Sequence, residues 1–198
     1  MPSLLKTKDA TQVFLEGVSE CKEFHRALKI VNKNSDGRAW LIGGFIFRTI
    51  AWQLYGSPKP KVDLDFIIEK PAKKLILPSG WIAIKNRFGN PKFIKGKNRI
   101  DFIPLENVFS IKSRKIKPTI NNFLTGVPLT IQAVVFDTKS NRILGDFGIN
   151  AIQNKVVEVN NLFFAQYAAK KKGKILNEYI KDMAESLDFK AIYPNETD

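Results

Sequence analysis

Two aspartates with the spacing of a strand face are the residues best suited to chemistry in this chain. Asp63 and Asp65 alternate in an otherwise apolar run, residues 62–68, which is typical of a central strand. Alternation predicts that both carboxylates lie on one face of the sheet. Carboxylates this close repel unless a cation lies between them, and Mg²⁺ or Mn²⁺ suits oxygen ligands and substrate phosphates. The alternative is a strand cap, or an ion pair with a lysine such as Lys61.

A third acid, Asp101, lies in another apolar run, residues 99–105. If this strand lies beside that of Asp63 and Asp65, the three carboxylates could hold two metal ions that activate an attacking oxygen and stabilise leaving pyrophosphate. The alternative for Asp101 is an ion pair with Arg99 or a nearby lysine.

A glycine pair precedes these acids. Gly43 and Gly44 follow a short apolar strand, residues 39–42, and open a helix predicted over residues 45–55. Backbone without a Cβ can approach a phosphate closely, and a helix N-terminus offers N–H donors to an anion. Arg48, one turn further on, either reaches that phosphate or forms a surface salt bridge. The pattern predicts a nucleotide-binding turn beside the acids.

The positive charge is concentrated in one stretch. The chain carries 32 Lys and Arg against 19 Asp and Glu, a net charge of +13. Residues 85–117 contain ten of the bases, and only two acids, Asp101 and Glu106. The ten are Lys85, Arg87, Lys92, Lys95, Lys97, Arg99, Lys112, Arg114, Lys115 and Lys117. Interleaved with Trp81, Phe88, Phe93 and Phe102, they favour binding to a polyanion such as RNA, with stacking of its bases. The alternative is a solvated basic surface.

The remaining patterns predict a mixed α/β domain. Helical spacing runs over residues 14–31, with Asp9 or Thr11 as cap, and again over 161–187 with a break near Gly173. Further strands are predicted at 81–84, 91–94, 129–136, 143–144 and 156–159, and a short helix or loop at 119–126. Asp137 and Asp146 are assigned to turns.

Composition excludes several classes of site. A single cysteine, Cys21, and a single histidine, His25, exclude an intramolecular disulfide and a cysteine-rich zinc site. We find neither a signal peptide nor a membrane-spanning segment, so a cytoplasmic protein without membrane contact is expected.

In this order, the motifs resemble the nucleotidyltransferase superfamily, which includes DNA polymerase β. The branch that they resemble most is the head domain of poly(A) polymerases and CCA-adding enzymes. GGFIFR at residues 43–48 and GSPKPK at 56–61 resemble that branch's Gly-Gly helix and the turn into Asp-x-Asp, and residues 129–159 resemble a second conserved block. The resemblance implies a nucleotidyltransferase fold, a mixed sheet flanked by helices, and Mg²⁺ (or Mn²⁺) with an NTP at Asp63, Asp65 and Asp101.

The chain departs from the branch at the positions that grip and select the nucleotide. The branch's Arg-Asp pair falls on Val127 and Pro128, its Asn falls on Gln132, and the arginines of its neck helix are missing from NNLFFAQYAAKKK at residues 160–172. We expect a head domain at 1–160, a short neck-like helical extension at 161–192 and a disordered tail at 193–198.

The expected activity is transfer of a nucleoside monophosphate from an NTP to a hydroxyl, the 3′ end of RNA or tRNA, with release of pyrophosphate. The same resemblance implies that Asp101 accepts the proton of the attacking hydroxyl. The alternatives are a non-catalytic RNA-binding head domain and a toxin-type nucleotidyltransferase that modifies tRNA or protein. The sequence leaves the NTP and any antitoxin or oligomeric partner open.

Overall fold

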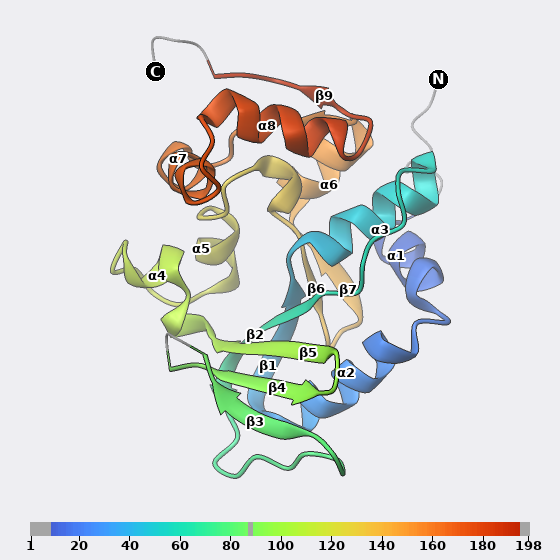
Figure 1. Ribbon diagram of the computed structural model, residues 1–198, viewed down its shortest axis with the longest axis vertical. Coiled ribbons are helices and arrows are strands. Elements are labelled where there is room, and N and C mark those ends of the chain that lie inside the picture. The colour runs from blue at the N-terminus through green and yellow to red at the C-terminus, as the bar shows by residue number, and fades with distance from the viewer. Residues whose placement is uncertain (1–8, 87–88, 195–198) are drawn as a thin grey trace.

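The computed structural model describes residues 9–86 and 89–194, and its centre is a seven-stranded mixed sheet (Figure 1). The strand order is β3-β4-β5-β2-β1-β6-β7, in which only β2 and β5 pair in parallel. The strands are β1 (Ser35–Ile42), β2 (Leu64–Pro71), β3 (Ile82–Lys85), β4 (Pro91–Lys95), β5 (Asn98–Pro104), β6 (Val135–Asp137) and β7 (Arg142–Leu144). The mixed α/β class predicted from the sequence is confirmed.

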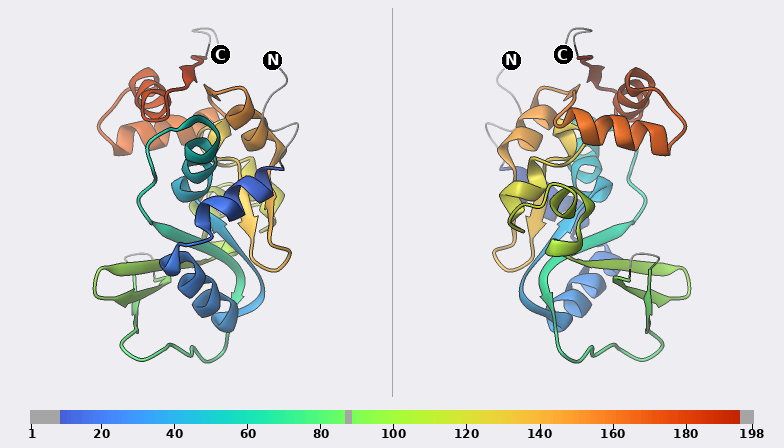
Figure 2. Two further views of the ribbon diagram at one scale, coloured as in Figure 1. Left: turned by 90° about the vertical axis from the view of Figure 1, so that its right-hand side faces the viewer. Right: turned by 90° about the vertical axis from the view of Figure 1, so that its left-hand side faces the viewer.

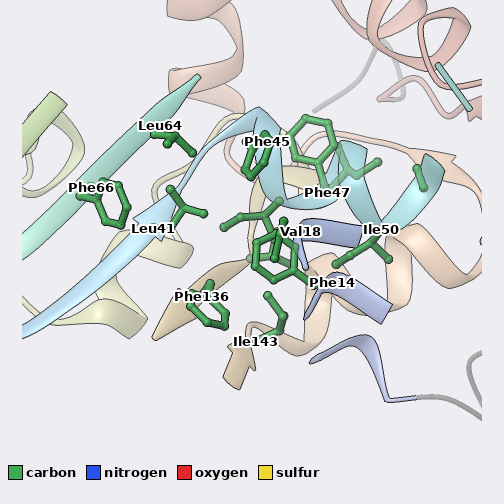
Figure 3. Close-up of a cluster of buried hydrophobic side chains, with 14 of the residues drawn as sticks. Phe14, Val18, Leu41, Phe45, Phe47, Ile50, Leu64, Phe66, Phe136 and Ile143 are labelled. Atoms are coloured by element: carbon green, nitrogen blue, oxygen red, sulfur yellow. The ribbon is translucent and has the colours of Figure 1, made fainter. Parts of the chain in front are cut away.

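Helices cover both faces of this sheet, as opposite views show (Figure 2). The larger core packs α1 (Ala10–Val18), α2 (Lys22–Asn34) and α3 (Gly44–Tyr55) on one face, around rings such as Phe14 and Phe136 that lie 5.1 Å apart (Figure 3). The smaller core lies on the other face, where α4 (Phe109–Lys112) and α5 (Ile120–Leu124) bury Trp40 and Ile67.

The C-terminal part also packs on the larger core. It comprises α6 (Asp146–Gln153), β8 (Val156–Val157), α7 (Leu162–Lys171), α8 (Leu176–Glu185) and β9 (Lys190–Ala191), of which β8 and β9 pair in parallel. Within residues 9–86 and 89–194, no helix is both long and apolar enough to span a bilayer.

The N-terminal helix predicted over residues 14–31 is two helices. The hydroxyl of Ser19 donates to the carbonyl of Glu16 at 2.8 Å, which closes α1, and α2 begins only at Lys22. Asp9 caps α1 as predicted, since its carboxylate accepts from the backbone N–H of Thr11. The helical spacing of apolar residues continues across the break because each of the two helices buries an apolar face in the same core.

The strand predicted over residues 129–136 is wrong for most of its length. Residues 130–132 form a 3₁₀ turn, in which the side chain of Gln132 accepts from the N–H of Leu129, and only β6 remains extended. The run is apolar because Val134 enters the larger core and Val135 the smaller one. Burial on both sides gives the same sequence signal as a central strand.

Two further differences concern turns. The sequence pattern did not predict α6, in whose first turn Asp146 lies. Asp137 does serve a turn, because its carboxylate accepts from the backbone N–H of Lys139 at 2.9 Å. The tail expected at 193–198 falls mostly outside the described residues.

Candidate active site

The acids singled out in the sequence lie together on the central strands. Asp65 in β2 and Asp101 in β5 are direct neighbours in the parallel register. Because residues in register share a face, both carboxylates project from the same side of the sheet. Asp63 lies in the segment just before β2, which begins at Leu64, and is exposed. The sequence therefore predicted that the strand of Asp101 neighbours that of Asp65, but it began the latter strand two residues too early and so placed Asp63 in it.

The three carboxylates interact electrostatically. Burial, followed by the negative charges of Asp63 and Asp101, raises the pKa of Asp65 to about 7, against the opposing effect of Lys92. A solvated carboxyl has a pKa of 3.8. Ionisation of Asp65 is therefore unfavourable in this site, and a bound cation would offset the repulsion between the carboxylates.

Lys92 already supplies one positive charge. It lies opposite Asp101 in the antiparallel pairing of β4 with β5, and its ammonium donates to the Asp101 carboxylate at 2.8 Å. In the described part of the chain, no group of three acidic, histidine or cysteine side chains is arranged to hold a metal. Oxygen donors of the kind that Mg²⁺ prefers are present in Asp63 and Asp65. Asp101 is engaged by Lys92, which is the ion pair considered as its alternative role.

Gly43 brings the glycine turn against this acid pair. Ile42 lies opposite Asp65 in the β1–β2 register, and Gly43 follows with φ 88° and ψ −166°, a conformation essentially restricted to glycine. A Cβ at Gly43 would lie 3.3 Å from the Asp65 carboxylate. Helix α3 starts at Gly44 without a side-chain cap, so its first N–H groups are available to an anion beside the acids.

The two glycines should respond differently to substitution. We expect Gly43→Ala to lower the free energy of unfolding by about 1–3 kcal/mol, because its backbone conformation is strained for an L-residue. Gly44→Ala is the matched control, since its Cβ would meet no atom closer than 3.7 Å and its φ is not positive. Urea unfolding of both variants checks this, and equal midpoints would contradict the assigned role of Gly43.

A pocket of about 340 Å³ lies between Gly44 and Asp63. Its lining combines Gly44 and Asp63 with three cationic side chains, Arg48, Lys59 and Lys61. The sequence suggested Lys61 only as an ion-pair partner of Asp63 or Asp65. All three residues are described, and no ion pair of 4.0 Å or less joins Lys61 to either aspartate. The signal for this pocket was the Lys-Pro-Lys turn between the helix and the acids, and Lys59 and Lys61 are additional candidates for phosphate binding.

Arg48 lines this pocket but also makes a structural contact. Its guanidinium donates to the hydroxyl of Ser186, beyond the end of α8, at 3.0 Å. Burial lowers the pKa of Arg48. A phosphate in the pocket would therefore share Arg48 with the C-terminal segment.

The predicted nucleic-acid contacts are spread over several surfaces. Lys97 and Arg99 line a separate cavity of about 130 Å³ with Asp63. Lys95 donates to the carbonyl of Ser79. Arg114 donates to Ser110, Asn122 and Thr125 within the fold. Lys85, Lys112, Lys115 and Lys117 are exposed, and Arg87 lies outside the described residues.

Phe93 and Phe102, two of the aromatic residues expected to stack on nucleic-acid bases, are instead in the core. Phe93 and Phe102 are fully buried and pack on each other at 4.9 Å, and Trp81 is 8% exposed. Phe88 lies outside the described residues. Strand alternation explains why the stacking expectation fails. Neighbouring residues of a strand point to opposite faces of the sheet, so a ring beside an exposed basic residue can lie in the core.

Comparison with known proteins identifies the fold. No family model and no curated protein matches the sequence. Among solved structures, a CCA-adding enzyme in complex with CTP superposes with a TM-score of 0.65 at 17% identity, over 93% of this chain and 43% of that one. The Bacillus stearothermophilus CCA-adding enzyme with CTP gives 0.59 at 16% identity, over 89% and 42%. An apo tRNA-processing enzyme gives 0.55 at 18% identity, over 97% and 45%.

The matches cover most of this chain, yet the chain spans less than half the length of each enzyme. The superpositions, with TM-scores of 0.65, 0.55 and 0.59, show a shared architecture. The chain has the nucleotidyltransferase fold of the CCA-adding enzymes.

Proposed function

We propose that this protein is a metal-dependent nucleotidyltransferase that transfers a nucleoside monophosphate from an NTP to a hydroxyl of RNA, releasing pyrophosphate. The observation that carries the proposal is the alignment of Asp65 with Asp101 in the sheet, with Gly43 and the open N-terminus of α3 beside them. Acids and anion-binding N–H groups at one place are what phosphoryl chemistry requires. Solved enzymes of the same fold carry CTP, ATP or tRNA.

In this proposal, the residues divide into phosphate-binding and metal-binding groups. The backbone of Gly43 and Gly44 would bind the triphosphate, together with Arg48, Lys59 and Lys61 in the adjoining pocket. Asp63 and Asp65 would hold Mg²⁺, with Asp101 joining them when it separates from Lys92. The bound cation would neutralise phosphate charge and polarise the reacting phosphorus.

Asp101 would also position the acceptor. Its carboxylate lies where β5 meets β2, and about a fifth of its side chain is exposed. There it would accept the proton of the attacking hydroxyl. Lys92, released from Asp101, would then be free to contact a substrate phosphate.

Residues 161–192 would act as a neck-like extension that supports the nucleotide pocket. Ser186 bonds Arg48, and the hydroxyl of Ser57 donates to the carbonyl of Leu187 at 2.7 Å. Since the branch's selecting arginines are missing at residues 160–172, we propose that nucleotide choice here rests on other contacts.

Transfer should be tested with each of the four α-³²P-labelled NTPs, Mg²⁺ and total RNA. We expect label to enter RNA with the wild-type chain, and neither with Asp65→Asn nor in EDTA. Label that enters protein instead would establish the protein-modifying alternative. Absence of label, with RNA bound equally well in EDTA and by Asp65→Asn, would establish a non-catalytic binding module.

A further inference from the structure

An exposed group of aromatic rings lies away from the acids, on α4 and α7. Phe109 is 50% exposed, Phe163 62% and Tyr167 46%. Phe109 stacks on Tyr167 with ring centroids 4.9 Å apart and an interplanar angle of 29°. Phe163 and Tyr167 are four residues apart on α7, so they lie on the same side of that helix. We call Phe109, Phe163 and Tyr167 the aromatic patch.

The patch is fixed to the core by a buried ring. Phe164 is 4% exposed and makes edge contacts with both Phe109 and Phe163, at 5.9 and 5.1 Å. The Arg114 guanidinium lies 5.7 Å from the centre of Phe164 and is itself bonded to Ser110 and Thr125. The exposed rings are therefore held in place before any partner binds, which lowers the entropy cost of binding.

The two segments that carry the patch are rich in positive charge. Residues 107–125, which include α4, and residues 159–177, which include α7, each contain four bases and no acid. Lys112 is one turn from Phe109, and Lys170 and Lys171 are one turn from Tyr167. All three lysines are exposed. Each end of the patch is thus flanked by cations.

Rings flanked by lysines suit one class of partner. Protein interfaces enrich aromatic residues but are depleted of lysine. Single-stranded nucleic acid presents stackable bases alongside phosphates, and its binding sites combine aromatic side chains with positive charge. We propose that the aromatic patch binds unpaired bases of the acceptor RNA, with Lys112, Lys170 and Lys171 contacting the flanking phosphates. This deepens the proposed function, because it rests on RNA being the acceptor.

Binding of a labelled 12-nucleotide single strand, measured by fluorescence anisotropy in EDTA without NTP, tests the proposal independently of transfer. We expect Phe163→Ala and Tyr167→Ala each to weaken binding about tenfold, the loss of one stacked base. Phe163→Tyr should bind like the wild type and Phe163→Leu like Phe163→Ala, because stacking requires a ring. Phe147→Ala is the matched control, since Phe147 is 73% exposed on α6, beside Asp146.

The lysines should act through salt dependence. Lys112→Ala and Lys170→Ala should each lower the slope of log K against log salt by about 0.7, whereas the aromatic variants should leave it unchanged. Each variant is used only if its melting temperature stays within a few degrees of the wild type.

Three results would overturn the proposal. Aromatic variants that bind within twofold of the wild type would show that the patch does not bind the strand. A duplex of the same sequence that binds as tightly as the single strand would show that unpaired bases are not recognised. Wild-type self-association lost in Phe163→Ala, with RNA affinity unchanged, would identify a protein interface instead. Because the binding assay contains neither NTP nor free metal, its result does not depend on transfer, and a failure of the proposed catalysis is recognised separately.

Discussion

Replacing Asp65 by Asn should reduce nucleotidyl transfer by about three orders of magnitude, while raising stability at neutral pH. The loss follows from removal of a metal-binding carboxylate, which contributes several kcal/mol to the barrier, each 1.4 kcal/mol being about tenfold in rate. The gain follows because Asp65 is a buried carboxyl beside two other acids. Function and stability thus oppose each other at this position.

The pH dependence of stability follows from the same carboxyl. With the pKa of Asp65 at about 7 in the folded chain and 3.8 when solvated, the folded chain binds the proton more tightly. This contribution to stability is complete below about pH 4 and is lost as pH rises through 7. Above pH 7, Asp65→Asn should therefore exceed the wild type by about 1–3 kcal/mol, less than the full shift implies because the carboxylates can move apart.

Urea unfolding between pH 5 and 8.5, without metal, measures this difference. Glu106→Gln is the control, because it removes the same charge from an exposed residue. Identical pH profiles for Asp65→Asn and the wild type would contradict the electrostatic account. Turnover near that of the wild type would remove Asp65 from the proposed active site.

Replacing Asp101 by Ala should reduce transfer at least about a hundredfold, as expected for loss of a catalytic proton acceptor. Affinity for NTP with Mg²⁺ should remain, because Asp63, Asp65 and the glycine turn are intact. The variant separates catalysis from ion pairing, since Asp101 is bonded to Lys92.

Lys92→Met is the matched control, because it removes the same ion pair from the other strand. Both variants should lose roughly 1–2 kcal/mol of stability, since the pair is partly buried. Turnover should fall only a few-fold in Lys92→Met. Single-turnover kinetics at several NTP concentrations, together with urea unfolding, would measure these effects. Equal effects of the two variants on turnover and on unfolding would assign Asp101 to ion pairing alone.

Local patterns predicted the parts of the site that lie close together in sequence. The alternation around Asp65 and Asp101 and the glycine turn at Gly43 depend on two- to four-residue patterns, which a sequence displays directly. The bond from Lys92 to Asp101 depends on the register of a hairpin, and that from Arg48 to Ser186 joins residues 138 apart. Such contacts are set by tertiary packing.

Burial of individual rings was the least predictable feature. Phe102 and Phe109 are seven residues apart in the same basic stretch, yet one is fully buried and the other half exposed. The sequence pattern favoured base stacking for Phe102, which is buried, and did not single out Phe109, which is exposed. The difference arises because Phe102 of β5 packs in the larger core, whereas Phe109 of α4 contacts the rings of Phe164 and Tyr167 of α7 at the surface.

The packing of the C-terminal helices has a consequence for how substitutions spread. Ile180 and Leu187 belong to the same buried cluster as Phe47 and Ile50 of α3, the helix that starts at the glycine turn. Arg48 of α3 and Ser57, just beyond its end, are both bonded to residues 186–187, so a segment distant in sequence contacts this helix and the turn that follows it. A substitution that leaves a cavity at Ile180 is therefore expected to loosen the packing of α3, and with it the proposed phosphate-binding end of that helix, although no residue of the pocket is changed. Substitutions in the C-terminal helices would then affect the site through packing alone.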